Sequence, residues 1–188
     1  MNSFNFIIPL KKENSGMLTG IASTTGVDKD EERMSEDALK QMVKDIKTMG
    51  VNLFGNHEHN WENTLGVIKN AELINNEVAI EITLDDDKTN PKIPMLLNKL
   101  KRGIMLGLSV GGNVDSFKWE YNRELGKKIK VLDSVKIYEV SVVGIPSNSS
   151  SYLSIPMAIA KGYKEKRCPV CYSKDIKNGV CSQCLTHI

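Results

Sequence analysis

The sequence has 188 residues, of which 40% are hydrophobic and 26% are charged. This composition excludes a mainly disordered or fibrous chain, and the length fits one domain of ordinary size with room for a small appendage. The formal net charge of +2 argues against a protein that coats nucleic acid, because such a protein needs a clear excess of basic residues.

The early part of the chain combines short strands with one well-marked helix. Strands are expected over residues 4–9 and 17–22, followed by a charged loop over residues 26–32. Ser35 has the side chain of a helix N-cap, and Gly50 supplies the stop. The apolar residues between them repeat at helical spacing: Ala38, Leu39, Met42, Val43, Ile46 and Met49.

The middle of the chain predicts a hairpin and a second helix. A short strand over residues 51–56 runs into a polar loop over residues 57–63. Strands over residues 65–73 and 78–84 are expected to form a hairpin that turns at Asn75 and Asn76, since asparagine tolerates positive φ. The second helix opens at Asn90-Pro91 and ends at Gly103.

Strands dominate the rest of the first 160 residues. They are expected over residues 104–110, 128–133 and 135–143, with a polar excursion through Trp119 and Tyr121 between the first two. Strand-rich sequence with two inserted helices predicts an α+β fold with a curled, mostly antiparallel sheet or barrel.

Charge and cysteine are distributed unevenly along the chain. From Lys161 onward there are six basic and two acidic side chains, whereas residues 1–160 contain 19 basic and 21 acidic ones. All four cysteines lie between Cys168 and Cys184. We therefore expect a main domain over residues 1–158, a basic linker over residues 159–167 and a small unit over residues 168–188.

The four cysteines form two CxxC pairs with nine residues between them: Cys168, Cys171, Cys181 and Cys184. No stretch approaches the ~20 apolar residues of a membrane helix, and the first ten residues do not have the pattern of a secretory signal. In an intracellular protein, paired cysteines favour metal ligands over disulfides. The spacing predicts a zinc ribbon with one structural Zn²⁺, whose binding would supply the folding free energy of this small unit.

The partner of such a ribbon is left open by the sequence. The basic linker would allow contact with nucleic acid, but small zinc ribbons dock on proteins just as readily. No membrane partner is expected.

Three features of the main domain bear on chemistry. His57 and His59 share one loop at the end of a strand, and Ser109 lies among glycines in Gly107-Leu-Ser-Val-Gly-Gly. Glycines permit close backbone approach, which suits an exposed nucleophile or backbone donors for an oxyanion. Glu139 stands in an otherwise apolar strand, where a charge needs a partner or an exposed edge.

Five short motifs occur in an order that resembles the prohead maturation proteases of tailed bacteriophages, and together they span residues 15–155. They are Gly20-Ile-Ala with Val27-Asp28, Val51-Asn-Leu-Phe-Gly-Asn-His57-Glu58, Leu65-Gly66, Gly107-Leu-Ser109-Val-Gly111, and Glu139-Val-Ser-Val-Val with Pro146-Ser-Asn148.

The resemblance implies a serine endopeptidase related in fold to the herpesvirus assembly proteases, with a closed β-barrel and surrounding helices. It further implies cleavage of scaffold and capsid-protein segments, and of the protease itself, inside the immature capsid in the host bacterium. When the motifs are matched one by one, the resemblance implies that His57 is the general base and that Ser109 is the nucleophile. Glu139 is our choice for the acid that orients the histidine, with Asp133 as its rival and His59 as the rival of His57.

Two other functions are compatible with the residues. A metallohydrolase would use His57, Glu58 and His59 with Asp28 or Glu62, but the sequence offers no obvious third ligand. A non-enzymatic assembly or nucleic-acid-binding adaptor would leave Ser109 and His57 purely structural. The metal expected from the sequence is the structural zinc alone, with no cofactor for catalysis.

Overall fold

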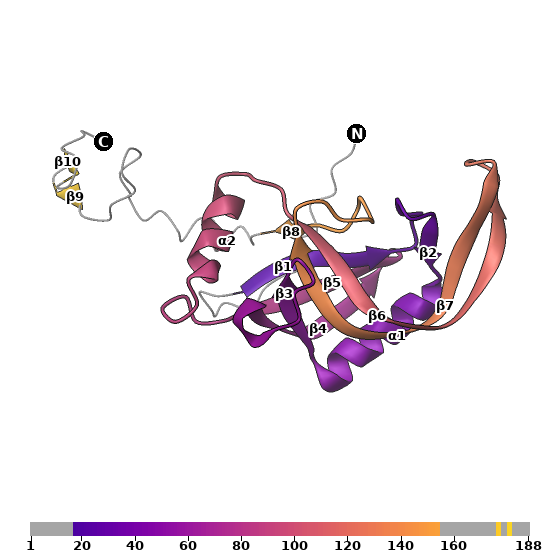
Figure 1. The fold of residues 1–188 in the computed structure, drawn as a ribbon, viewed down its shortest axis with the longest axis horizontal. Coiled ribbons are helices and arrows are strands. Elements are labelled where there is room, and N and C mark those ends of the chain that lie inside the picture. Colours follow the sequence, from indigo (N-terminus) through magenta and orange to yellow (C-terminus); the bar gives the residue numbers. More distant parts are fainter. Residues whose placement is uncertain (1–16, 155–175, 178–179, 182–188) are drawn as a thin grey trace. The chain divides into compact units, whose positions relative to one another are not determined.

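The computed structural model describes residues 17–154, 176–177 and 180–181. The chain forms two compact units, Met1–Pro156 and Met157–Ile188. The first unit contains β1 (Met17–Thr24), β2 (Glu32–Met34), α1 (Glu36–Met49), β3 (Val51–Gly55), the 3₁₀ turn η1 (Trp61–Asn63), β4 (Thr64–Ile74), β5 (Glu77–Leu84), α2 (Lys92–Lys101), β6 (Gly107–Asn122), β7 (Lys127–Val143) and β8 (Leu153–Ser154) (Figure 1). In the second unit, β9 (Ile176–Lys177) pairs with β10 (Val180–Cys181).

The first unit is a mixed α+β structure dominated by one sheet of eight strands. Its strand order is β2-β7-β3-β4-β5-β1-β8, and β6 pairs with β7. Most neighbours are antiparallel, as expected, but β7 runs parallel to both β2 and β3. The sheet curls into a half-barrel, and a single bridge joins Gly107 at the start of β6 to Tyr152 beside β8. These pairings do not show the closed barrel that the resemblance implies.

Helix α1 confirms the strongest local prediction. The Ser35 hydroxyl accepts a hydrogen bond from the Ala38 N–H at 3.1 Å, and Gly50 ends the helix with a φ of 69°. Leu39, Met42 and Ile46 are fully buried. They form the face that packs on β4 and β7, so the helix holds in place the strand that carries Glu139.

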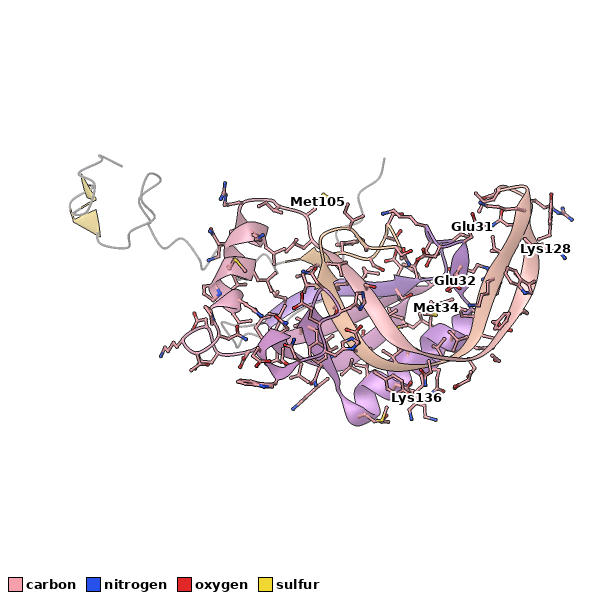
Figure 2. The ribbon with its side chains drawn as sticks, in the orientation of Figure 1. Glu31, Glu32, Met34, Met105, Lys128 and Lys136 are labelled. Atoms are coloured by element: carbon pink, nitrogen blue, oxygen red, sulfur yellow. The ribbon has the colours of Figure 1, made fainter. Side chains whose placement is uncertain are left out.

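The β4–β5 hairpin and helix α2 also agree with the sequence. Asn75 and Asn76 turn the hairpin with φ values of 50° and 63°. Helix α2 includes Pro94 in its first turn, where no intrahelical donor is lost. The segment after α2 differs from the prediction, because residues 104–106 precede β6 and Met105 is 85% exposed at the surface (Figure 2).

The predicted polar excursion between two strands is wrong. Strand β6 continues through Trp119 and Tyr121, and β7 continues without a break across Ser134, so the two form one long antiparallel ribbon. The register shifts at Gly111/Gly112, Val114/Ser116 and Ser116/Phe117. Such bulges interrupt the alternation of polar and apolar residues on which strand prediction depends.

Ion pairs join the outer part of this ribbon to the segment around β2. Glu32 pairs with Lys130 at 2.7 Å, and Glu31 pairs with Lys127 at 2.7 Å. Glu31, Glu32 and Met34 lie beside the ribbon, and Lys128 lies toward its outer end (Figure 2). The end of the predicted charged loop is therefore a short strand, and it begins at Glu32.

Candidate active site

The end of β3 places His57 beside β7. In the parallel pairing of these strands, Asn52 lies opposite Glu139 and Phe54 lies opposite Ser141. The chain then turns sharply, because Asn56 and His57 have positive φ values of 53° and 59°. Non-glycine residues seldom adopt this conformation, and backbone strain of this kind concentrates at functional sites.

The turn brings His57 into a hydrogen-bonded group with two side chains of β7. His57 Nδ1 lies 2.6 Å from Glu139 Oε1, and the backbone N–H of His57 donates to Ser141 Oγ at 3.2 Å. The hydroxyl of Ser141 donates to Glu139 Oε2 at 2.5 Å. Both carboxylate oxygens of Glu139 therefore have donors, and the imidazole of His57 is oriented through one of them.

Glu139 is a buried carboxyl group with a lowered pKa. Its side chain is 5% exposed, and this burial alone would raise the pKa of Glu139. Hydrogen bonds from Ser141, His57 and His59, together with the charge of His57, outweigh the burial and hold the pKa below its ordinary value. The environment thus favours an ionised acceptor for an imidazole N–H.

Ser109 lies on β6, the strand next to β7. In the β6–β7 register Ser109 lies directly opposite Ser141, and Gly111 lies opposite Glu139. Residues two apart share a face of a strand, and directly opposed side chains have Cβ atoms about 4.5–5.5 Å apart. Strands β3, β7 and β6 therefore present His57, Glu139 and Ser109 on one patch, around the buried Ser141.

The glycines around Ser109 lie within β6, and two of them allow close packing against β7. A Cβ atom on Gly111 would lie 2.3 Å from Glu139 Oε1, and one on Gly112 would lie 2.1 Å from the Lys136 carbonyl oxygen. Ser109 also lines a cavity of about 250 Å³ together with Leu108, Val110 and Asn113. The half-buried serine thus lies opposite Ser141 in the β6–β7 pairing and lines an open space.

His59 contacts the same carboxylate oxygen as His57. Its Nε2 atom lies 3.2 Å from Glu139 Oε1, and its ring packs against Phe54 with centroids 5.5 Å apart. The contact of His57 is shorter and uses Nδ1, which leaves Nε2 available for a proton from a substrate or serine hydroxyl. This geometry favours His57 over His59 as a general base.

Asp133, the rival of Glu139, lies elsewhere on β7. It is six residues away along the strand, which corresponds to ~20 Å at ~3.4 Å per residue. Its carboxylate pairs with Lys118 at 3.4 Å. The structure therefore brings Glu139, and not Asp133, to the histidines.

The metal ligands expected of a metallohydrolase are not brought together as predicted. Asp28 accepts hydrogen bonds from the backbone of Asp30 and Glu32, and Glu58 contacts Asn63. Among the described residues, the cluster able to hold a metal ion consists of His57, His59 and Glu139. Glu139 is a third candidate ligand that the sequence did not reveal, because its proximity to the histidines depends on the parallel pairing of β3 with β7.

Ser141 is the member of this hydrogen-bonded group that the sequence did not single out. It is fully buried and bonds to both His57 and Glu139. The sequence did contain a signal for Ser141: it lies two residues after Glu139, and residues two apart in a strand share a face. Of the predicted zinc ligands, Cys168, Cys171 and Cys184 lie outside the described residues, and Cys181 is the last residue of β10.

Comparisons with known proteins identify a family and a similar fold. A family model described as caudovirus prohead serine protease matches residues 8–168. Among solved structures, the capsid assembly protease of bacteriophage T4 is similar in fold, with a TM-score of 0.55 and 16% sequence identity over 68% of this chain and 81% of that chain. Among curated proteins, none matches the chain significantly. Within the described residues, no helix has the length and apolar character needed to cross a membrane.

Proposed function

This chain belongs to the caudovirus prohead serine protease family, and from that premise we propose that it is an endopeptidase with Ser109, His57 and Glu139 as its catalytic triad. The observation that carries this assignment is the 2.6 Å contact between His57 Nδ1 and Glu139 Oε1, with Ser109 on the adjacent strand. An ionised carboxylate at Nδ1 keeps the proton on that nitrogen, so that the lone pair of Nε2 is free to act as a base.

The proposed reaction follows from these positions. His57 Nε2 takes the hydroxyl proton as Ser109 Oγ bonds to the scissile carbonyl carbon, and the carbonyl oxygen becomes an oxyanion. Backbone N–H groups near Val110–Gly112 are the candidates for binding that oxyanion. The imidazolium then protonates the leaving amine as the C–N bond breaks, and a water molecule, deprotonated by His57, hydrolyses the acyl-enzyme.

The proposed substrates are protein segments in the immature capsid of a tailed phage. A capsid assembly protease has scaffold and capsid proteins as its natural targets, and it acts within the host bacterium. The cavity of about 250 Å³ beside Ser109 offers room for part of an extended peptide. We also propose self-cleavage between Ser147 and Arg167, where a serine-rich exit leads into the basic linker.

The C-terminal cysteines are proposed to hold one structural zinc. Two CxxC pairs supply four thiolates, which complete a tetrahedral shell and leave no open position for catalysis. The ribbon would contribute docking rather than chemistry. Zinc removal is therefore expected to unfold residues 168–188 while the main domain keeps its fold.

The experiment that tests the function combines the purified full chain with its own scaffold and capsid subunits. New protein termini, identified by mass spectrometry, are expected within the scaffold and capsid chains. If those chains stay intact while they bind the protein, the result would support the non-enzymatic assembly adaptor instead.

A further inference from the structure

The active-site group also has the composition of a metal site. We propose that His57, His59 and Glu139 bind one divalent transition-metal ion, Zn²⁺ being the best match, and that this ion switches the protease off. The proposed metal site is argued from the geometry alone, whereas the proposed inhibition rests on the protease function proposed above.

The ligand atoms already lie within reach of a single ion. One nitrogen of each histidine and one carboxylate oxygen all lie within 4.8 Å of one another. Both imidazoles contact the same atom, Glu139 Oε1, at 2.6 and 3.2 Å. Two histidines and one glutamate are a frequent ligand set for zinc, with ligand bonds of about 2.0–2.2 Å. Small rotations of the exposed imidazoles would open the space for the ion.

Each ligand is held in place by a neighbour. Ser141 donates to Glu139 Oε2 and also accepts the backbone N–H of His57. The ring of Phe54 packs against the ring of His59. A hydrogen-bonded neighbour such as Ser141 orients a metal ligand and raises its affinity. The site is therefore largely preformed before an ion enters.

The ion has a path from solvent. The side chains of His57 and His59 are 42% and 59% exposed, whereas that of Glu139 is 5% exposed. The carboxylate thus forms the floor of the site and the two imidazoles form its open rim. A water molecule can complete the coordination shell at this rim.

Metal binding and proton abstraction compete for the same imidazole. A neutral imidazole carries one proton, which catalysis requires on Nδ1, facing Glu139. An ion bound to Nδ1 needs the lone pair of that atom, so the remaining proton must reside on Nε2. Nε2 then has no lone pair with which to accept the proton of Ser109, and the nucleophile is not activated. Zinc would therefore act through a change of tautomer.

The test compares three full-length proteins: the wild type, His59→Ala and the control Glu62→Gln, which removes a nearby carboxylate charge outside the cluster. Zinc chloride is added, free ion is removed by gel filtration, and bound zinc per chain is measured by elemental analysis. All three proteins keep the four cysteines, so any zinc held there is common to them. The wild type and Glu62→Gln are expected to bind one more ion than His59→Ala.

Peptide cleavage is then measured in each protein over a zinc titration. Zinc is expected to inhibit the wild type and Glu62→Gln reversibly. In His59→Ala the half-inhibiting concentration should rise by more than about tenfold, since loss of even an outer-shell partner costs about 10–100-fold in affinity. Circular dichroism and thermal melting confirm that each variant is folded.

The outcomes separate the two proposals. Equal zinc content in the wild type and His59→Ala would overturn the metal site, and zinc-dependent activation would overturn the inhibition in favour of a metallohydrolase. A zinc-free wild type that cleaves no substrate would instead contradict the proposed protease function, while the stoichiometry still decides whether the metal site exists.

Discussion

Gly111 lies directly opposite Glu139 across the β6–β7 pairing, and a Cβ atom at this glycine would stand 2.3 Å from Glu139 Oε1. The missing side chain creates the space that the carboxylate occupies. The glycine of the Gly-Leu-Ser-Val-Gly motif is therefore tied to the acid that orients His57, and not only to the serine two residues before it.

Gly111→Ala is expected to displace the Glu139 carboxylate and to misorient His57. Misplacement of a catalytic group by ~1 Å can cost on the order of 10²-fold in rate, and we expect a fall in kcat of that size. The crowding should also lower the free energy of unfolding by about 1–3 kcal/mol. Peptide-cleavage kinetics and urea denaturation measure both effects.

Gly144→Ala is the matched control for this prediction, because no atom lies within 4 Å of the Cβ position at that glycine. Its kcat should be unchanged. Equal losses in the two variants would show that crowding at Gly111 has no specific link to the catalytic group.

Replacement of the acid distinguishes Glu139 from Asp133. Glu139→Gln removes the charge and can present an amide N–H to His57 Nδ1, which favours the wrong tautomer. In a serine protease triad, replacing the carboxylate by the corresponding amide lowers kcat by about 10⁴-fold. Asp133→Asn should retain nearly full activity, because Asp133 pairs with Lys118. Steady-state kinetics of both variants decide the assignment, and the opposite ranking would make Asp133 the acid.

Ser141→Ala tests the buried hydroxyl that links His57 to Glu139. The change leaves Glu139 Oε2 without this donor and the His57 N–H without its acceptor. An unsatisfied buried partner costs about 1–3 kcal/mol, so we expect a loss of stability in this range. Activity should fall by about 5- to 150-fold, which is far less than for loss of the nucleophile. Wild-type kinetics in this variant would show that Ser141 does not orient the histidine.

The lowered pKa of Glu139 predicts acid sensitivity of the fold. A group whose pKa is lower in the folded than in the unfolded state stabilises the fold above the unfolded pKa. For Glu139 this stabilisation is complete above its ordinary pKa of 4.5 and is lost as the pH falls through its lower folded value. The difference in free energy of unfolding between the wild type and Glu139→Gln should therefore shrink below about pH 4.5.

Chemical denaturation at a series of pH values measures this difference, and Glu124→Gln, at an exposed position in the turn between β6 and β7, serves as the control. A difference that stays constant from pH 7 to pH 3 would contradict a depressed pKa at Glu139.

Local signals made part of the fold predictable from the sequence. Ser35 and Gly50 mark the ends of α1, and Asn75 with Asn76 marks the β4–β5 turn, because caps and positive-φ turns depend on a few adjacent residues. The β6–β7 ribbon was not predictable in this way. Its bulges shift the side-chain alternation, so its polar outer part resembled a loop.

The candidate site was predictable residue by residue but not as an arrangement. His57 and Glu139 are 82 positions apart, and their contact depends on β3 and β7 being parallel neighbours in a largely antiparallel sheet. No local pattern encodes such a pairing. For the same reason the role of Ser141 and the cluster of His57, His59 and Glu139 emerged only from the structure. The zinc ribbon stays a prediction from cysteine spacing.

The most direct test of the central claim is cleavage by Ser109→Ala, with Ser116→Ala as the matched control. Ser116 is an exposed serine of the same strand that takes no part in the catalytic group. Single-turnover assays against the scaffold and capsid subunits should show Ser116→Ala cleaving at the wild-type rate. In Ser109→Ala the rate should fall by on the order of 10⁴–10⁶-fold while the thermal melt is unchanged. Undiminished cleavage by folded Ser109→Ala would contradict the proposed mechanism.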